Sequence, residues 1–433
     1  MSRFCEGKKE GGCPGRESTL FHVMMVGLGV CLLPGCALLG VRGQVKAIEN
    51  QAVIAVQVQG GAAERMNTYV VALAGSDILA VESPGSDQMA VLLVPEKSSE
   101  CTLLVFADAN QNRRFDQGEA AGALTGVVPV SLADPEAKGR LNRVRLGGGA
   151  AAVSRLRGLE VPRTGAADHA GFHLAVGEIA KPGEARFSTA AGEDGLWKPD
   201  SMLRQGNLGV YFLEPYDPTR IPVLFVHGIG GSPQDFDRLI PSLDRSRYQA
   251  WFFYYPSGFR LGKVANALDR ILELLHQKHG MPRLQMVAHS MGGLVARGAI
   301  QRLAARRAPL VVERFVSIST PWGGHNAASG GVRHLRYPVP SWVDIAPGSG
   351  YLKSLWSTPL PPETTHYLLY GYDTQRLPWL SHDNDGVIDE SSALYPQAQA
   401  EAVRVFGIHA DHVGILRDPL GLAKVNEFLS GRR

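Results

Sequence analysis

The chain has 433 residues, of which 45% are hydrophobic and 20% are charged, and its formal net charge is +3. Because 44 basic residues nearly balance 41 acidic ones, the composition excludes both a basic nucleic-acid-binding tail and an extended disordered protein. Four of the five cysteines lie within the first 36 residues, which excludes a disulfide scaffold. The length is sufficient for two domains, each with its own core.

The amino terminus has the pattern of a secretion signal. Residues 20–33 form an apolar run that is too short for a membrane-spanning helix of about 20 residues and fits a signal-peptide core. The run ends in Leu33-Pro34-Gly35-Cys36, which resembles the bacterial lipoprotein box. The resemblance implies a signal peptide over residues 1–35 and a lipid anchor on Cys36 in the cell envelope, with Ala37 favouring the outer membrane. An ordinary cleaved signal and an uncleaved anchor are the alternatives.

Residues 36–150 are predicted to form a small β-sandwich-like domain. Short apolar runs rich in β-branched residues are separated by Gly, Pro, Ser and Asp, which is typical of an all-β sandwich. The predicted strands cover residues 52–58, 69–73, 89–94 and 102–106. The small residues that begin at Gly147 indicate a linker, which we place at residues 151–165.

One loop of this domain has the spacing of a calcium site. From Asp108 to Glu119, oxygen-bearing side chains occupy positions 1, 3, 5, 9 and 12 of a twelve-residue loop. However, Arg113 occupies the sixth position, where such a loop needs glycine, and Arg114 adds a second positive charge. A turn without metal, built from Asx side chains, is therefore favoured over a calcium site.

Residues 166–433 are predicted to form an α/β domain. Strands are expected at 221–226, 248–255, 284–288, 315–318, 367–370 and 403–406, and helices at 263–278 and 294–306. Strands that alternate with helices predict a mostly parallel sheet covered by helices on both faces.

Ser290 has the sequence context of a nucleophile elbow. It lies between a predicted strand and a predicted helix, and small residues stand two positions away on each side, Ala288 and Gly292. Such a turn holds serine in a strained conformation, which leaves no room for larger neighbours. The Met291 N–H would supply one donor of an oxyanion hole, because that hole uses the residue after the nucleophile.

A second donor is expected from the glycine-rich segment after the first core strand. In His227-Gly228-Ile229-Gly230-Gly231, the N–H of Ile229 is the natural choice, since the flanking glycines let the backbone approach a substrate. His227 is interpreted as a structural residue that ties this loop, and His289 as a packing residue beside the elbow.

Together these motifs resemble the α/β-hydrolase superfamily, and within it bacterial serine lipases and esterases. The segment Ser319-Thr-Pro-Trp-Gly-Gly324 resembles the one that follows strand six in those enzymes. The resemblance covers residues 220–433 and leaves the β domain without an assigned partner. It implies the α/β-hydrolase fold, a Ser–Asp–His triad in that chain order and no metal or cofactor.

The acid and the base of the triad follow from the same resemblance. The segment Asn384-Asp-Gly-Val-Ile388 resembles the lipase loop that carries the carboxylate, which points to Asp385. Asp373, directly after a predicted strand, and Asp383 are the alternatives. His412 resembles the terminal histidine of the family and is the predicted base, with His409 as a loop residue. His366 and His382 are predicted bystanders.

An insertion at residues 325–362 is rich in apolar residues, Pro and Gly. It is interpreted either as a lid over an acyl pocket or as a fixed cap, and its apolar character favours a hydrophobic acyl ester over a small charged substrate. The sequence therefore predicts a membrane-anchored serine lipase or esterase. Acyl transfer or thioester hydrolysis on the same triad is one alternative. A surface binding protein with a hydrolase scaffold is another.

Overall fold

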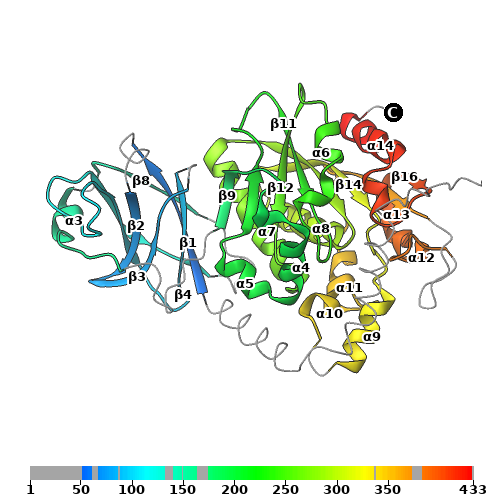
Figure 1. Ribbon diagram of the computed structural model, residues 1–433, viewed down its shortest axis with the longest axis horizontal. Coiled ribbons are helices and arrows are strands. Elements are labelled where there is room, and N and C mark those ends of the chain that lie inside the picture. The colour runs from blue at the N-terminus through cyan, green and yellow to red at the C-terminus, as the bar shows by residue number, and fades with distance from the viewer. Residues whose placement is uncertain are drawn as a thin grey trace, which may run out of the picture.

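The computed structural model describes residues 51–60, 67–85, 88–131, 140–148, 150–162, 174–335, 338–372 and 383–431. These residues form a β domain and an α/β domain that lie next to each other (Figure 1). The predicted signal peptide and Cys36 lie outside the described residues, as do Asp373 and His382. In the described part of the chain, no helix combines the length and the apolar character needed to cross a membrane.

The β domain consists of two sheets, as predicted. In the first sheet the order is β4 (Met89–Pro95), β1 (Gln51–Gln59) and β7 (Val130–Ser131), and β8 (Leu141–Arg145) pairs with β1 in parallel. The second sheet is antiparallel, with the order β3 (Asp77–Glu82), β2 (Asn67–Ala74), β5 (Cys101–Asp108) and β6 (Ala121–Val127).

Alternation along the strands buries both faces of each sheet. In β1, Ile54 and Val56 pack against the second sheet, whereas Ala55 between them packs against the α/β domain. On the outer face of the second sheet, Phe106 packs with Val161. Val161 lies in the stretch that we predicted to be a linker, residues 151–165. The structure describes this stretch as far as residue 162, and α3 (Ala150–Arg155) occupies its beginning. This part of the stretch is packed on the β domain.

The α/β domain is built on an eight-stranded sheet that is parallel except where β10 meets β12, which confirms the predicted fold class. The strand order is β16 (Ala402–Ile408), β15 (Thr365–Gly371), β14 (Val311–Ile318), β13 (Arg283–His289), β11 (Ile221–Val226), β12 (Tyr248–Tyr254), β10 (Leu208–Phe212) and β9 (Leu174–Ile179). Five of the six strands predicted for this domain lie within these elements, and the sixth, predicted at 248–255, extends one residue beyond β12. β9 and β10 were not predicted.

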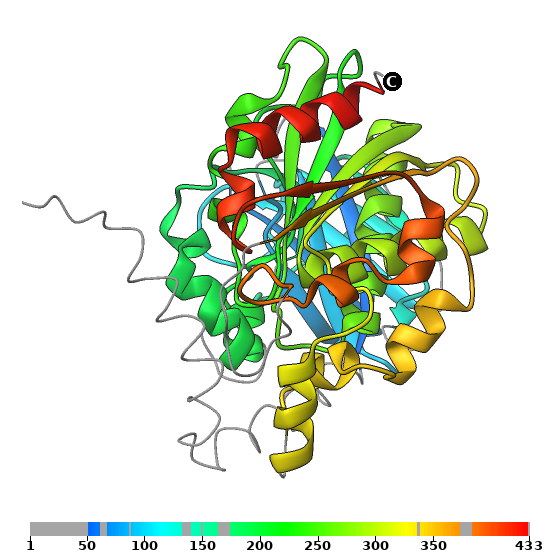
Figure 2. The same cartoon turned by 90° about the vertical axis from the view of Figure 1, so that its right-hand side faces the viewer.

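Helices cover both faces of this sheet (Figure 2). On one face lie α7 (Leu261–His279) and α8 (Met291–Ala305), and on the other lie α6 (Leu239–Ser242) and α14 (Pro419–Ser430). α7 forms because its buried residues recur at helical spacing, as in Val264, Leu268 and Ile271. The remaining short helices are η2 (Ala185–Phe187), α4 (Thr189–Trp197), α5 (Pro199–Arg204), η3 (Pro233–Phe236), α9 (Asn326–His334), α10 (Pro340–Ile345), α11 (Gly350–Trp356), α12 (Glu390–Ala393), α13 (Pro396–Glu401) and η4 (Gly414–Leu416).

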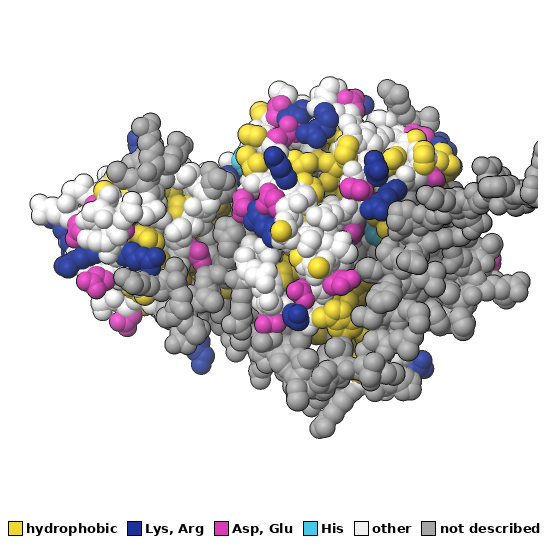
Figure 3. Space-filling view, viewed as in Figure 1, with side chains coloured by type: hydrophobic (Ala, Val, Ile, Leu, Met, Phe, Trp, Pro, Cys, Tyr) yellow, Lys and Arg dark blue, Asp and Glu magenta, His cyan; other side chains and the backbone are white. Residues whose placement is uncertain are grey.

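The β domain is attached to α7 by polar contacts as well as by apolar packing. The backbone N–H of Leu141 donates to Gln277 Oε1 at 2.8 Å, and the guanidinium of Arg270 donates to the carbonyl oxygen of Ser131 at 2.8 Å. Basic and acidic side chains are interspersed over both domains on the face shown in Figure 3. That mixture agrees with the small net charge.

Candidate active site

Ser290 stands at the sharp turn between β13 and α8. Its φ is 53° and its ψ is −131°, a conformation that non-glycine residues rarely adopt. The backbone N–H of Ser290 donates to the carbonyl oxygen of Ile318 at 2.8 Å, which fixes the turn to the neighbouring strand. A Cβ at Gly292 would lie 2.4 Å from the carbonyl oxygen of His227, so the turn requires glycine there, as predicted for an elbow.

The glycine-rich loop after β11 lies directly against Ser290. A Cβ at Gly228 would lie 2.9 Å from the Cβ of Ser290, so any side chain at this position would collide with Ser290. Ser257 Oγ accepts the N–H of Gly230 at 2.9 Å and holds the loop. Within the described residues, the N–H groups of Ile229 and Met291 have no hydrogen-bond partner. Two backbone donors are therefore available beside Ser290.

His227 holds this loop in place through hydrogen bonds of its ring. Its Nε2 accepts the N–H of Tyr255 at 3.3 Å, so the proton lies on Nδ1, which donates to the carbonyl oxygen of Gly228 at 2.8 Å. Its ring stacks on that of Tyr255, with 4.2 Å between the centroids. Burial lowers the pKa of His227 to about 4. A neutral ring with both nitrogens engaged is a structural residue, in agreement with the interpretation of the sequence.

Asp385 and His412 form a buried pair. His412 Nδ1 lies 2.7 Å from Asp385 Oδ2, and the carboxylate's other oxygen accepts the N–H groups of Val387 (3.0 Å) and Ile388 (2.7 Å). Burial acts to raise the pKa of the Asp385 carboxyl, but the His412 ring and the N–H donors outweigh it and hold the pKa below its ordinary value. Asp385 is therefore a carboxylate that fixes the orientation of His412.

His289 connects this pair to Ser290. It precedes Ser290 in the chain, its Nε2 donates to the carbonyl oxygen of His412 at 2.8 Å, and the two rings are 4.7 Å apart between centroids. Burial, and then the nearby His412, lower the pKa of His289 to about 3, so it is neutral. The structure thus brings Ser290, Asp385 and His412 to one edge of the sheet, at the carboxyl ends of its strands.

The alternative residues differ in their surroundings. Asp383 is exposed, and its carbonyl oxygen accepts the N–H of Glu390 at 2.9 Å. His409 is exposed and lies edge-on to a tyrosine ring. His366 is buried inside the sheet, where its Nε2 lies 2.9 Å from Ser317 Oγ and burial lowers its pKa to about 3.

His325 is a residue near the pair that sequence reasoning missed. Its Nδ1 accepts the N–H of Ala327 at 3.2 Å and caps α9, and its backbone N–H donates to the carbonyl oxygen of Ile345 at 2.7 Å. Burial, and then the nearby His412, lower the pKa of His325 to about 4. The ring is therefore neutral and carries its proton on Nε2. The sequence offered one signal for its position near the site: His325 directly follows the Pro-Trp-Gly-Gly segment.

Two buried charges hold the insertion at residues 325–362. Asp344 Oδ2 accepts the N–H of Leu261 at 2.7 Å, which joins α10 to the start of α7. Arg297 of α8 is fully buried and donates to the carbonyl oxygens of Leu355 and Thr358, each at 3.1 Å. It also forms a two-point ion pair with Glu401. These contacts favour the fixed cap over the mobile lid for α10 and α11.

Most of the apolar residues of the insertion fill the interior of this cap and do not line its entrance. Trp342, Ile345, Leu352 and Leu355 are each at most 4% exposed and belong to the core of the α/β domain. These four residues therefore stabilise the core and do not make the entrance apolar.

Two tryptophans lie near the glycine-rich loop that follows β11. α4 packs so closely on this loop that a Cβ at Gly192 would lie 2.8 Å from the carbonyl oxygen of Gly230. At the end of α4, the ring of Trp197 is half-buried and lies edge-on to that of Trp342, with 5.8 Å between their centroids.

The calcium-like loop of the β domain is held by its own carboxylates. Glu119 accepts the N–H groups of Ala109 and Asp116, each at 2.9 Å. Asp108 accepts those of Asn112 (3.2 Å) and Arg113 (2.9 Å). In the described part of the chain, no cluster of His, Cys, Asp and Glu has the arrangement of a metal site. The contacts favour the turn without metal.

A family model for the alpha/beta hydrolase fold matches residues 221–337, the segment that carries the glycine-rich loop after β11 and Ser290. The chain has the α/β-hydrolase fold. We name the part of the chain that forms the eight-stranded sheet and its helices the hydrolase domain, after this fold, and the two smaller β sheets form a separate domain before it.

The comparison with solved structures lists matches of low similarity. The mature lipase BlEst2 of Bacillus licheniformis is 20% identical, with 50% of this chain and 94% of that chain covered and a TM-score of 0.38. The lin2722 product of Listeria innocua is 16% identical (49% and 95% covered, TM-score 0.39). Aspergillus fumigatus lipase B is 15% identical (65% and 68% covered, TM-score 0.39). No curated protein matches the chain.

Proposed function

We propose that this protein is a serine hydrolase that cleaves carboxylic esters of hydrophobic acyl chains. The observation that carries the proposal is the junction at the elbow: Ser290 occupies a strained turn, and the residue before it contacts the buried His412–Asp385 pair. A serine in this conformation next to a histidine–carboxylate pair is the arrangement that nucleophilic acyl transfer requires.

The mechanism assigns one role to each group. With Nδ1 of His412 facing Asp385, Nε2 of His412 is left to take the proton of Ser290 Oγ as that oxygen bonds to the acyl carbon. The N–H groups of Ile229 and Met291 stabilise the resulting oxyanion. His412 then gives its proton to the leaving alcohol. Water, activated by the same ring, attacks the acyl-enzyme and releases the acid and free Ser290.

Support for a hydrophobic acyl group comes from Trp197 and the cap beside the oxyanion loop. Trp197→Ala is expected to reduce kcat/KM for long-chain p-nitrophenyl esters by about tenfold, while the acetate ester changes little, because only the long chain would lose apolar contact. An equal loss for all chain lengths would contradict this acyl site. The exposed Tyr372→Ala is the matched control.

The central test is hydrolysis of p-nitrophenyl esters of graded chain length by the wild type and by Ser290→Ala. Loss of at least about 10⁴-fold in kcat is expected, together with loss of covalent labelling by a fluorophosphonate. Ser354→Ala, an exposed serine of α11, serves as the control and should retain both. A wild type without activity or labelling would exclude the hydrolase. Product from an added alcohol would favour acyl transfer, and selectivity for thioesters would favour a thioesterase.

We also propose that a lipid on Cys36 anchors the protein to the bacterial cell envelope, at the outer membrane. The support is the apolar run and the Leu-Pro-Gly-Cys box. Growth with an alkyne-bearing fatty acid should label the wild type and Cys31→Ala, but not Cys36→Ala. Labelling that persists in Cys36→Ala would refute this assignment.

A further inference from the structure

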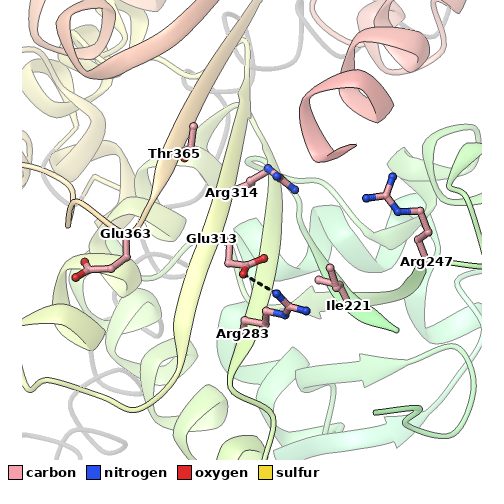
Figure 4. A pocket seen from close by; sticks show the side chains of 7 residues that line it. All are labelled: Ile221, Arg247, Arg283, Glu313, Arg314, Glu363 and Thr365. Carbon is pink, nitrogen blue, oxygen red and sulfur yellow. Dashed lines mark hydrogen bonds and ion pairs between the residues drawn. The ribbon is translucent and has the colours of Figure 1, made fainter. Parts of the chain in front are cut away.

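A pocket of about 480 Å³ lies at the amino ends of β11, β13, β14 and β15 (Figure 4). This edge of the sheet is opposite to the one that carries Ser290, because Ser290 follows the carboxyl end of β13. Charged side chains dominate the lining, which includes three arginines and two glutamates: Arg247, Arg283, Arg314, Glu313 and Glu363. The proposed ester hydrolysis uses none of them.

The arginines differ in their partners. Arg283 is paired with Glu313 at 3.1 Å. Arg247 and Arg314, in contrast, have no carboxylate partner among the described residues. Arg314 donates to the carbonyl oxygen of Leu429 at 2.6 Å, and the guanidinium of Arg247 lies 5.3 Å from the centroid of the Tyr248 ring.

Figure 4 shows the guanidinium groups of Arg247 and Arg314 pointing toward each other. Two like charges in this arrangement repel, and an anion between them would turn the repulsion into attraction. Planar guanidinium groups donate pairs of parallel hydrogen bonds, which match the oxygens of a phosphoryl group. Glu363 lies at the far side of the pocket in the same view, so an anion is favoured at the Arg247–Arg314 end.

A buried amide provides an independent sign of a missing polar partner. Gln285 is 0% exposed, and within the described residues neither its Oε1 nor its Nε2 has a hydrogen-bond partner. It pairs with Val223 on one side and Arg314 on the other, so its side chain lies on the same face of the sheet as Arg314. A buried amide without a hydrogen bond is unfavourable, and a polar ligand or a water molecule would satisfy it.

We propose that this pocket binds a phosphoryl-bearing anion, held by the guanidinium groups of Arg247 and Arg314. Gln285 lies on the same face of the sheet as Arg314 but is not itself part of the pocket lining. Free phosphate or a phosphomonoester is one source of this group, and the headgroup of an anionic phospholipid is another. The site is separate from Ser290, so it would bind its ligand whether or not the chain hydrolyses esters.

The test is isothermal titration of the full chain, purified in detergent, with inorganic phosphate and with glycerophosphoglycerol, the deacylated headgroup of phosphatidylglycerol. Saturable binding of phosphate alone supports a free phosphate or phosphomonoester, and binding of glycerophosphoglycerol supports the lipid headgroup. No binding of either probe overturns the proposal, and Gln285 is then satisfied by water.

Variants locate the binding. Arg247→Gln removes an exposed charge and is expected to weaken binding of the bound probe at least tenfold, the loss expected for one charge-assisted hydrogen bond. Arg314→Gln should do the same, but it also removes the hydrogen bond to the carbonyl oxygen of Leu429, so Arg247→Gln is the decisive variant.

Two further variants serve as controls. Glu363→Gln should leave the affinity for the probe unchanged or raise it. Arg417→Gln, an exposed arginine outside the pocket, is the matched control. Equal affinities of Arg247→Gln and Arg417→Gln would overturn the proposal.

Discussion

Two loops of this protein use the same local chemistry for different ends. In the β domain, both carboxylate oxygens of Asp108 accept backbone N–H groups of their own loop. In the hydrolase domain, one oxygen of Asp385 does the same, and the other oxygen faces His412. One carboxylate oxygen is therefore enough to accept the backbone N–H groups that form such a turn. The partner of the second oxygen distinguishes the two loops: a backbone N–H in the structural loop, and a histidine in the candidate catalytic loop.

The largest expected effect comes from changing that second oxygen. In Asp385→Asn, one amide atom can still accept the N–H groups of Val387 and Ile388, but the other presents N–H to His412 and favours the wrong tautomer. We expect kcat to fall by about 10³- to 10⁴-fold in a folded protein. Asp383→Asn, in the exposed neighbour, should retain near-normal turnover. Near-normal turnover of Asp385→Asn would assign the acid elsewhere, with Asp373 as the next candidate.

The stability of the hydrolase domain should depend on pH. His227, His289 and His325 lie in the candidate active site with folded pKa values of about 4, 3 and 4, below the unfolded value of about 6.5. Between pH 6.5 and 4, the unfolded chain binds protons that the folded chain does not. The free energy of unfolding should therefore fall as the pH decreases through this window, by an amount on the order of several kcal/mol.

Urea denaturation of the hydrolase domain at pH 7 and pH 5, followed by a change in tryptophan fluorescence, measures this effect. His289→Asn should show a smaller pH dependence than the wild type. The exposed His409→Asn should show the same dependence as the wild type. Equal unfolding free energies of the wild type at the two pH values would contradict neutral histidines around the site.

A smaller effect is expected in the calcium-like loop. Asp108→Ala removes the acceptor of the Arg113 N–H, whereas the Asn112 N–H keeps Asn110 Oδ1 as its second acceptor. We expect a loss of about 1–3 kcal/mol in stability with no change in esterase kcat. The exposed Asp77→Ala is the control. EDTA should leave the melting temperature of the wild type unchanged. A drop that calcium reverses would favour the calcium interpretation of Asp108–Glu119.

The smallest effect is expected at His325. Because asparagine also caps helices, His325→Asn should keep α9 in place and change stability by no more than about 0.5 kcal/mol. The ring is neutral above pH 5, so its removal should leave the acidic limb of the kcat/KM profile in place. A shift of that limb would show that His325 carries charge beside His412.

Much of the hydrolase fold could be predicted because its signals are local. The strand at 221–226 is a continuous apolar run, and the helix at 263–278 shows its buried face as a period along the chain. The elbow requires small residues at fixed offsets from Ser290. In contrast, β9 and β10 are short and each contains glycine at positive φ, so neither resembles an ordinary buried strand.

The remaining features depend on neighbours that only the fold creates. Arg297 is indistinguishable from a surface arginine in the sequence, yet its ion pair lies with Glu401, about a hundred residues away. Gln285 becomes an unpaired buried amide only because β11 and β14 flank its strand. His325 is near His412 because the start of the cap contacts the segment that follows Asp385. There, Asn326 Nδ2 donates to Asp389 Oδ2 at 3.0 Å.

The position of the β domain has a consequence for solubility. A sheet edge exposes unpaired backbone groups and is a site for aggregation between chains. In this protein the edge strand β9 lies against β4, and Lys278 Nζ donates to the carbonyl oxygen of Val176 at 3.2 Å. The β domain therefore shields one edge of the eight-stranded sheet. A hydrolase domain without it would expose both that edge and the apolar surface now buried against Ala55.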